Sequence, residues 1–426
     1  MAVAAGEAGD WSYWRVLRSG RLGVLLAGIL ISSAGNGMII SALPLLALQL
    51  RGRLPAGLTI ALVQASPYVL GTALALTLGL TRLRLAPRGL VLADSALSSV
   101  MFILLGAVAA TGTLTLWMLV SGLLVGSVFR IAATSSRRLL ATGMTGPAGQ
   151  LAVNGLLGTS ASLAAYMIGP VLGGVVSALA GPGVALIIDG LTFIVMLGAA
   201  CYAVPAAPRA RPAAGTRRAG PESGLRILRA IPPAARLFAV VFWFNLLYMP
   251  VEVALPLLVR GPLHGNGAAL GLIWSGFGAG AVLGGVATVW LRRVPRQRLL
   301  VLIIAAWAAA VALLAFSPTV LFAAGAFFLG GLVYAPFTPT AYTFVQSMLT
   351  PDEQQPVVTL WSAGGVLAGP VGLALAGPLV SVTGAEGGLI ASALLTIALV
   401  PLAAIGLRRA GAGARAPGRA ETDAWT

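Results

Sequence analysis

Long apolar runs alternate with short polar gaps along almost the whole 426-residue chain. A run of about 20 apolar residues is long enough to cross the hydrocarbon core of a bilayer as a helix. The pattern therefore predicts an all-α polytopic membrane protein. The twelve transmembrane helices are expected at about 22–48, 57–81, 89–110, 113–134, 150–176, 183–204, 237–259, 267–290, 299–316, 320–345, 356–380 and 387–407.

One long gap divides these runs into two blocks of six. Residues 205–236 are rich in Pro, Ala and Arg, a composition typical of a loose linker, and one short surface helix is expected near Leu225–Ile231. The expected domains are a cytoplasmic N-terminal segment at 1–21, a six-helix bundle at 22–204, the linker at 205–236, a second six-helix bundle at 237–407 and a cytoplasmic tail at 408–426.

The two blocks resemble each other in sequence at three equivalent places, which indicates a duplicated six-helix unit. Parallel repeats of six helices build one large class of secondary transporters, in which the substrate site lies near mid-membrane between the halves. The matching pairs are RLAPR (84–88) with RRVPR (292–296), MTGPAGQ (144–150) with MLTPDEQ (348–354), and the Gly-Pro step 169–170 with 369–370.

Composition and charge fit a membrane protein and give it an orientation. The chain is 58% hydrophobic and 9% charged, whereas an average globular domain is about 25% charged. All 27 basic residues are arginine; 23 lie in segments on one side of the predicted membrane and three on the other, with Arg130 inside a span. Because cytoplasmic loops carry the positive excess, both termini and the linker are expected to be cytoplasmic, in the cell inner (plasma) membrane. This distribution also argues against nucleic acid as the partner of the +16 net charge.

Several function classes have no support in the sequence. The chain has no lysine for a phosphate-binding loop, no paired Cys/His metal spacing and no nucleophile elbow. Its one cysteine, Cys201, excludes an intrachain disulfide. No apolar stretch precedes Arg15, so the N-terminus is not read as a cleavable signal peptide. We expect neither enzyme activity nor a cofactor or metal, and we expect a monomer.

Three stretches carry a family resemblance: YWRVLRSGRLGVLLAGILISSAGNGMIISALPLLAL (Tyr13–Leu48), GPVLGG (Gly169–Gly174) and DGLTFIVM (Asp189–Met196). They resemble the major facilitator superfamily, in particular its drug and siderophore exporters, which include the enterobactin exporter and macrolide-efflux-like proteins. The resemblance covers nearly the whole chain apart from the termini and the linker. It implies two six-helix bundles that rock about a central site.

The chain departs from this family pattern at two places. In LRLAPRG, Leu83 and Ala86 stand where the superfamily usually has Asp and Gly, although Arg84, Arg88 and the acid Asp94 are kept. These three residues are the candidates for an inner-loop brace, with Asp94 paired to one of the two arginines. In the first span, Asn36 stands where this branch often has Asp, which removes one possible proton carrier.

The fifth and eleventh spans contain helix breakers that would destabilise a soluble helix. Between membrane helices, small residues let two backbones approach closely, and neighbouring groups bond the carbonyl that a proline frees. Two interpretations fit these residues. Either they form a face for close helix packing, or the two equivalent helices are bent gates that line one cavity. The candidates for gating or packing are Gly169, Pro170, Gly173, Gly174, Gly369 and Pro370.

Four charged residues lie within predicted spans, where charge is costly and marks a functional site or a partner. Asp94 and Arg130 lie near the arginine-rich side and have local explanations, an arginine partner and snorkelling. Glu252 lies about 15 residues into the seventh span between Pro250 and Pro256, where a bent or broken helix is expected. Glu252 and Asp189 are therefore the candidates for proton coupling, although a structural hydrogen bond would also explain each.

Polar and aromatic residues near these carboxylates are candidates for contact with a substrate. Asn245 and Tyr248 share a helical face with Glu252, seven and four residues before it. Packing or interfacial anchoring would also explain each aromatic residue. The substrate-cavity candidates are Asn36, Gln64, Asn245, Tyr248, Trp274, Tyr334 and Trp361.

The sequence favours a secondary-active exporter of a small amphipathic or lipophilic compound, such as a drug, secondary metabolite or siderophore, driven by proton antiport. Its partners would then be that small molecule, protons and the lipid bilayer. Two alternatives stay open. One is an importer or uncoupled facilitator, which Asn36 in place of Asp supports. The other is a membrane sensor or assembly protein without transport, which the scarcity of intramembrane carboxylates supports.

Overall fold

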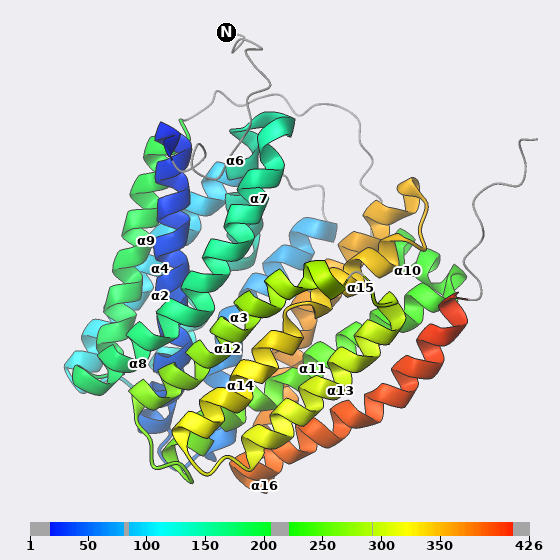
Figure 1. The fold of residues 1–426 in the computed structure, drawn as a ribbon. Coiled ribbons are helices and arrows are strands. Elements are labelled where there is room, and N and C mark those ends of the chain that lie inside the picture. The colour runs from blue at the N-terminus through cyan, green and yellow to red at the C-terminus, as the bar shows by residue number, and fades with distance from the viewer. Residues whose placement is uncertain (1–17, 81–84, 206–220, 292, 412–426) are drawn as a thin grey trace, which may run out of the picture.

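The computed structural model describes residues 18–80, 85–205, 221–291 and 293–411. This part of the chain consists of helices and short connections, without a strand (Figure 1). Ten helical segments in this part of the chain are long and apolar enough to cross a membrane, with Leu116–Gly143, Val320–Gln346 and Asp352–Ile405 counted as one segment each, and a shorter apolar helix lies at Ala164–Leu179. The predicted all-α membrane fold is therefore confirmed.

The helices form two groups that follow each other along the chain, which we call the N-terminal and C-terminal bundles. The N-terminal bundle contains α2 (Gly20–Leu50), α3 (Ala56–Leu80), α4 (Pro87–Ala110), α5 (Leu116–Gly126), α6 (Arg130–Gly143), α7 (Gly146–Leu163), the π-helix η1 (Ala164–Ile168), α8 (Gly169–Leu179) and α9 (Pro182–Ala203). The C-terminal bundle contains α10 (Pro221–Ala230), α11 (Pro232–Arg260), α12 (Gly267–Leu291), α13 (Arg296–Ala315), α14 (Val320–Tyr334), α15 (Phe337–Gln346) and α16 (Pro351–Gly411).

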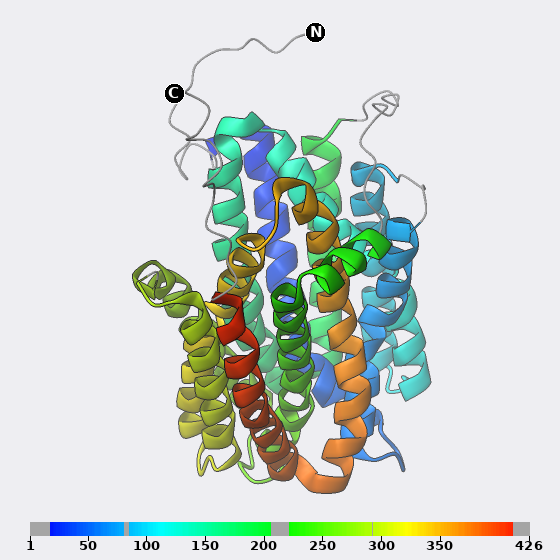
Figure 2. The same cartoon turned by 90° about the vertical axis from the view of Figure 1, so that its right-hand side faces the viewer.

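Most helices match the predicted spans within a few residues, and the differences have local causes. The fourth and tenth spans are each divided, into α5 with α6 and α14 with α15. The last two spans are joined in α16, where Gly384 turns the chain back with a φ of 77°; Figure 2 shows this turn at the lower edge. Glycine adopts positive φ without the steric penalty of other residues. The short helix expected in the linker is α10, and α11 begins earlier than predicted, at Pro232.

Helix starts recur at equivalent places in the two bundles. The side chains of Thr115 and Thr319, which are 204 residues apart, accept hydrogen bonds from the backbone of Met118 and Phe322. Each threonine therefore satisfies one of the amide groups that a helix start leaves free. Because both capped helices are then interrupted before the next one begins, the bundles repeat a helix break as well as a sequence pattern.

The two bundles meet at one end and separate toward the other (Figure 1). We call the end that holds Gly52 and Gly384 the closed end, and the end at which α4 and α13 begin the open end. At the closed end the backbone amide of Leu58 on α3 donates a 2.9 Å hydrogen bond to Ser381 Oγ on α16. Toward the open end, Gly158 and Gly365 have no other residue's atom within 4 Å of the position of an added Cβ, because they face a cavity.

A second contact between the bundles joins α8 and η1 to α12. Gly174 packs on Gly267, and Gly271 packs on Pro170, so closely that a Cβ atom on either glycine would clash with backbone. Gly278 meets the backbone of Tyr166 in the same way. These close approaches are typical of small-residue interfaces between membrane helices. We call this contact the α8–α12 seam.

Hydrogen bonds from serines stabilise the irregular backbone before Pro170. Proline provides no amide hydrogen, and the helix widens into the π-turn η1 just ahead of it. Ser275 Oγ on α12 donates a 2.8 Å bond to the carbonyl of Met167, and Ser41 Oγ on α2 donates a 3.1 Å bond to that of Pro170. The glycines and the proline of this segment therefore allow a contact between the two bundles, while the segment itself stays helical.

The six gating or packing candidates do not share one environment. Gly169 and Gly173 pack against the α2 backbone inside the N-terminal bundle, whereas Gly174 lies in the α8–α12 seam. Gly369 lines the cavity and contacts no other residue at its Cβ position, and Pro370 follows it in α16. The two Gly-Pro steps are equivalent in sequence and occupy different surroundings in this arrangement of the bundles.

Large apolar side chains cover the outward faces of the helices. Trp117, Leu179, Leu321 and Val382 are exposed over 65%, 83%, 76% and 87% of their surface. A water-soluble monomer rarely exposes extensive apolar patches, whereas a bilayer solvates them. The exposed surface and the apolar helices together describe a multi-pass membrane protein.

Candidate functional site

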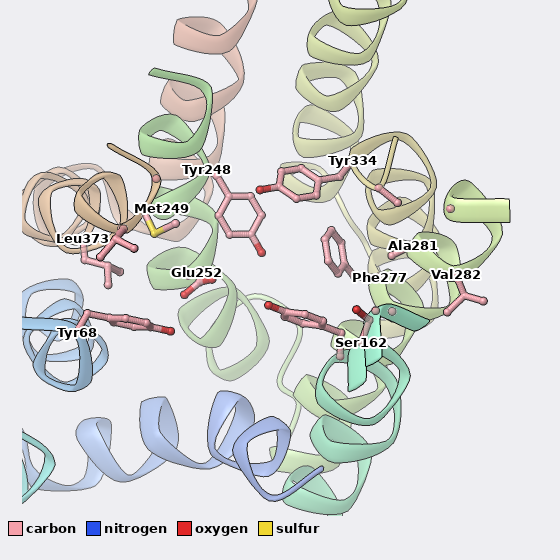
Figure 3. Close-up of a pocket in the computed structure, with 18 of the residues that line it drawn as sticks. Tyr68, Ser162, Tyr248, Met249, Glu252, Phe277, Ala281, Val282, Tyr334 and Leu373 are labelled. Atoms are coloured by element: carbon pink, nitrogen blue, oxygen red, sulfur yellow. The ribbon is translucent and has the colours of Figure 1, made fainter. Parts of the chain in front are cut away.

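A cavity of about 800 Å³ lies between the two bundles. Its wall is formed by α3, α6, α7 and η1 from the N-terminal bundle, and by α11, α12, α14 and α16 from the C-terminal bundle. Figure 3 shows the side chains converging on this space from opposite sides. A largely apolar pocket with a few convergent polar groups is the usual form of a small-molecule site.

Glu252 on α11 is the one charged side chain among the described residues that line the cavity. Its carboxylate forms neither a salt bridge nor a hydrogen bond with another described residue. A bent or broken helix was expected at the flanking prolines, and α11 continues through Pro250 and Pro256 without a break. Ser392 Oγ of α16 supports it by donating a 2.6 Å bond to the carbonyl of Leu247.

Four tyrosines from both bundles surround Glu252: Tyr68 on α3, Tyr166 on η1, Tyr248 on α11 and Tyr334 on α14. All four side chains line the same cavity as the Glu252 carboxylate. In Figure 3 the hydroxyl groups of Tyr68 and Tyr248 point toward Glu252. The cavity therefore combines one acid with several phenol rings.

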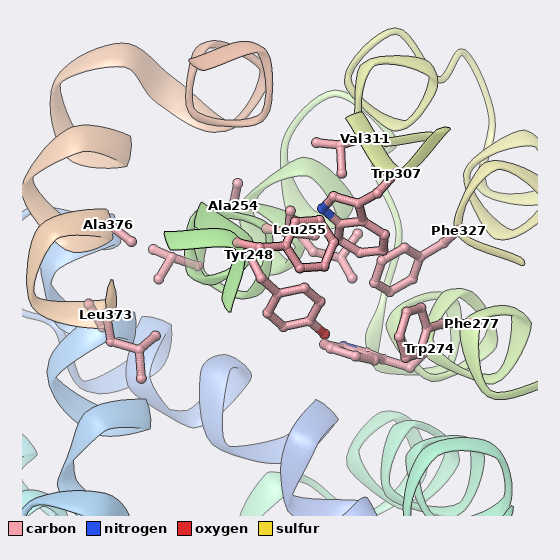
Figure 4. Packing of buried hydrophobic residues seen from close by; sticks show 14 of the residues in the cluster. Tyr248, Ala254, Leu255, Trp274, Phe277, Trp307, Val311, Phe327, Leu373 and Ala376 are labelled. Atoms are coloured by element: carbon pink, nitrogen blue, oxygen red, sulfur yellow. The ribbon is translucent and has the colours of Figure 1, made fainter. Parts of the chain in front are cut away.

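Aromatic packing holds the C-terminal part of this wall in place. Tyr248 stacks on Trp307 with ring centroids 5.3 Å apart, and Phe277 lies 4.8 Å from Phe327 (Figure 4). Tyr334 contacts Tyr248 with ring centroids 5.4 Å apart. Aromatic pairs at these separations add about 0.5–1.5 kcal/mol each beyond the apolar area that they bury. The rings that face the cavity are thus backed by a packed core.

The polar stripe predicted on α11 is only partly exposed to the cavity. Tyr248 and Glu252 line the cavity wall. Asn245 lies behind it, where its side-chain amide donates to the carbonyl of Val241 and its Oδ1 accepts a 3.1 Å bond from the Tyr334 hydroxyl. Asn245 therefore orients Tyr334, and Tyr334 meets the cavity.

The remaining cavity candidates lie outside the lining. Trp274 is 2% exposed and packs on Phe327, and Trp361 is 8% exposed and packs on Phe238. Asn36 bonds the carbonyl of Ser32 within its own helix. Gln64 is a half-buried residue of α3 whose Oε1 has no partner among the described residues. Helical spacing does not separate a core aromatic from a lining one.

The inner-loop brace differs from the expected arrangement. Asp94 pairs with Arg137 of α6 at 2.8 Å, inside the N-terminal bundle, instead of with Arg84 or Arg88. Arg88 donates a 2.7 Å bond to the carbonyl of Val204 at the end of α9, and Arg84 lies outside the described residues. Asp94 and Arg137 are both buried, at 1% and 9% exposure, so the ion pair lies in the interior of the N-terminal bundle.

Asp189 and Arg130 belong to the same buried region. Asp189 is fully buried, and its Oδ1 accepts a 3.2 Å bond from the Thr192 hydroxyl. The guanidinium of Arg130 lies over the rings of Phe102 and Phe193, at 5.2 and 5.5 Å. The expected snorkelling of Arg130 toward the membrane surface is therefore wrong, because the aromatic faces hold this cation inside the bundle.

Comparisons with known proteins agree with this architecture. A family profile described as transmembrane secretion effector matches residues 54–334, and one described as Major Facilitator Superfamily matches residues 251–426. The chain belongs to the major facilitator superfamily. No curated protein matches the chain at a significant level.

Several solved structures of transporters share this fold. A mutant of the nucleoside transporter NupG has a TM-score of 0.67 and 13% identity, over 90% of this chain and 99% of NupG. A bacterial homolog of the human lysosomal transporter Spinster has a TM-score of 0.66 and 15% identity, over 95% and 98%. The human organic anion transporter MFSD10 (TETRAN) has a TM-score of 0.60 and 18% identity, over 92% and 99%. At these identities the likeness shows the fold alone.

Two tyrosines of the transporter's cavity were not predicted from the sequence. Tyr68 follows Pro67 in α3, and Tyr166 lies three residues before Gly169 in η1. Both are exposed over more than 40% of their surface, as a side chain facing an open cavity would be. A tyrosine beside a proline or glycine break inside an apolar run was the available signal, since broken transmembrane helices line transporter sites.

The buried ion pair between Asp94 and Arg137 is expected to stabilise the protein. Arg137→Gln is expected to destabilise the protein by about 3–5 kcal/mol, because it leaves Asp94 buried without its partner. The double variant Asp94→Asn/Arg137→Gln should recover most of this loss. Thermal unfolding in detergent measures the effect, and exposed Arg138→Gln is the neighbouring control. An Arg137→Gln transition equal to that of Arg138→Gln would contradict the structural role of the pair.

Proposed function

We propose that the protein is a secondary-active exporter of a small amphipathic or lipophilic compound, coupled to proton antiport. The carrying observation is a mostly apolar cavity between two bundles with a single carboxylate in it. The family description, transmembrane secretion effector, and the resemblance of the first, fifth and sixth spans to drug and siderophore exporters support the outward direction. The transporter acts as a monomer in the plasma membrane.

Alternating access would use the two contacts at the closed end. The bond from Leu58 to Ser381 and the α8–α12 seam hold the bundles together there, while the cavity faces the open end. The helix starts at the open end carry arginines such as Arg88 and Arg296, and this end is therefore cytoplasmic under the positive-inside rule. Rocking of the bundles about the cavity would break these contacts and form a seal at the open end.

Coupling follows from the cost of burying an unpaired charge. During rocking the cavity passes through a state closed at both ends. An ionised, unpaired Glu252 would lose water in that state, which costs several kcal/mol. The bundles can therefore pass through this closed state when the carboxylate is protonated or paired with a positive charge. Asp189 is the alternate proton site, but its burial inside the N-terminal bundle separates it from the cavity.

Accumulation in proteoliposomes tests this function against its alternatives. A proton-coupled exporter accumulates its substrate against a gradient when a pH difference is imposed, whereas an uncoupled facilitator only equilibrates it. A sensor or assembly protein moves none. A panel of compounds applied to a pump-deficient host finds the substrate for the assay. Equilibration without accumulation under a pH difference would contradict the proposal.

Cysteine labelling tests the proposed orientation, in which the linker and the tail are cytoplasmic. With Cys201 replaced by serine, single cysteines in Gly215→Cys and Arg415→Cys, both outside the described residues, should react in intact cells only with membrane-permeant maleimides. Arg53→Cys at the closed end is exposed and should react with impermeant reagents as well. Labelling of position 215 or 415 by an impermeant reagent would refute the cytoplasmic linker and tail.

A further inference from the structure

A separate depression lies at the closed end of the molecule, and its wall holds two positive charges. It has a volume of about 440 Å³ and is lined by the ends of α2 and α11 and the start of α3. Arg51 directly follows α2 in the N-terminal bundle, and Arg260 is the last residue of α11 in the C-terminal bundle. We call this hollow the arginine depression. The other described residues of its wall carry no charge; they are Leu45, Leu48, Gln49, Ala56, Leu257 and Gly261.

Neither arginine has a partner within the part of the chain that the structure describes. Both side chains are exposed, and neither forms a salt bridge there. The acid Glu386 lines a neighbouring hollow together with Arg51, and no ion pair joins these two side chains. The dipole of a helix favours an arginine at its C-terminal end. That effect acts on each helix alone, whereas here two like charges from different bundles line one space.

The ends of α2 and α11 lack the direct contact that other helices make at the closed end. There α3 is bonded to α16 through Leu58 and Ser381, and α8 packs on α12 in the seam. Among the described residues no hydrogen bond joins α2 to α11, although both helices line the arginine depression. The neighbouring hollow shares Arg51 with this depression and includes Ser381. A ligand held by both arginines would therefore add a third contact between the bundles at this end.

We propose that the arginine depression binds a phosphate-bearing anion, which bridges Arg51 and Arg260 and stabilises the closed end. The guanidinium group presents a planar fork of N–H donors that matches the oxygens of a phosphate group. One phosphate group has enough oxygens to accept from two such forks. The side-chain amide of Gln49 is a further donor in the same wall.

The two charges also give the anion a preference for one arrangement of the bundles. When the closed end forms, two guanidinium groups come to line the same space, and their repulsion opposes closure. An anion between them replaces this repulsion with two attractions. When the end opens, the arginines separate with their bundles and the bridging site is lost. Because a ligand shifts a conformational equilibrium by its differential affinity for the two states, the anion favours closure of this end.

The expected consequence is regulation of transport from the outer side of the membrane. In the proposed orientation the arginine depression faces the outside of the cell, and release of an exported substrate requires that this end opens. The anion therefore slows export. This consequence rests on the proposed export function, whereas anion binding and closure of this end do not. A free phosphate compound and the phosphate headgroup of an anionic lipid share the required chemistry.

Inorganic pyrophosphate is the probe for a soluble anion. Calorimetric titration of the purified protein in detergent should show binding that weakens as salt is added, because salt screens exposed charges. Arg51→Gln and Arg260→Gln should each weaken binding at least about fivefold, because each removes one set of charge-assisted hydrogen bonds. Arg53→Gln is the matched control. Arg53 is exposed at the same end, does not line the arginine depression and should keep wild-type affinity.

Nanodiscs distinguish a lipid headgroup from a soluble anion. If a lipid is the ligand, the wild type should unfold at a higher temperature in nanodiscs with phosphatidylglycerol than in phosphatidylcholine alone, since a ligand of the folded state stabilises it. Arg51→Gln and Arg260→Gln should lose this difference, and Arg53→Gln should keep it. Pyrophosphate binding that phosphatidylglycerol leaves unchanged assigns the site to a soluble anion.

The distance between two spin labels measures closure directly. With Cys201 replaced by serine, Arg53→Cys places one label on the N-terminal bundle, and Val382→Cys, at a position that is 87% exposed, places the other on α16. Pyrophosphate, or phosphatidylglycerol in nanodiscs, should increase the population with the shorter distance. The same pair of labels combined with Arg260→Gln should show no such increase.

Equal pyrophosphate affinity in Arg260→Gln and Arg53→Gln without a phosphatidylglycerol effect, or no response to either probe, would overturn the anion site. Binding that leaves the label distances unchanged would overturn the stabilisation of the closed end. These measurements require no transport. Failure of the proposed export function would appear separately, as the absence of substrate accumulation in proteoliposomes free of both probes.

Discussion

Glu252→Gln is expected to abolish proton-driven accumulation of the substrate. A pH difference of one unit corresponds to about 1.4 kcal/mol per proton, so one-for-one exchange in the wild type should approach roughly tenfold accumulation in proteoliposomes. Glutamine fills nearly the same space and cannot release a proton or balance a cation. The variant should therefore show no accumulation at any imposed pH difference, as measured by uptake of labelled substrate.

Two variants with altered carboxylates serve as comparisons for this result. Asp189→Asn should reduce accumulation less, since Asp189 is buried behind the cavity wall, and Glu386→Gln on the exposed turn of α16 should not change it. Accumulation by Glu252→Gln with the wild-type pH dependence would leave Glu252 as a structural residue. A selective loss in Asp189→Asn would then assign the proton to Asp189.

Gly271→Leu is expected to abolish transport by opening the α8–α12 seam. Even a Cβ at this position would clash with the carbonyl oxygen of Pro170, so a leucine must push α12 away from α8. The bundles could then no longer close at this end. A single cysteine in the cavity, Gly365→Cys in a protein with Cys201 replaced, should become accessible to impermeant maleimides from outside the cell.

Gly325→Leu is the matched control for this substitution. Gly325 lies in α14 of the same bundle, is exposed, and has no other residue's atom near its Cβ position. It should keep transport and leave the cavity cysteine protected from outside. Protection of that cysteine in Gly271→Leu, together with normal transport, would show that the seam is not the outer gate.

The fold was predictable because the membrane imposes a simple physical code. Each span needs about 20 apolar residues, and arginines mark one side of the bilayer, so helix number and pairing follow from periodic features of the chain. The differences came from backbone detail. Neither the π-turn at Ala164–Ile168 nor the join at Gly384 changes hydropathy, so the apolar pattern of the chain does not show them.

The site was predictable only where a residue was chemically unusual for its surroundings. Glu252 stood out as an acid in the middle of a span, and the structure brings it to the cavity wall with Tyr248 and Tyr334. Trp274 and Trp361 have the same residue chemistry as a lining aromatic and lie in the core. Which face of a helix meets the cavity depends on how two bundles rotate against each other, and no local pattern encodes that.

The partner of Asp94 was missed for a related reason. Arg84 and Arg88 are near it in sequence, whereas Arg137 lies 43 residues away on α6. Asp94 is buried in the N-terminal bundle and pairs with an arginine that is buried there too. The charge pattern correctly indicated a cationic partner and assigned it to the wrong element.

The decisive experiment follows the proton movement that accompanies substrate movement in proteoliposomes of the wild-type protein. With a pH dye trapped inside and the membrane potential clamped, adding a transported compound to one side should move about one proton in the opposite direction per molecule. We expect this exchange in the wild type and its absence in Glu252→Gln. Substrate movement without proton movement in the wild type would contradict it.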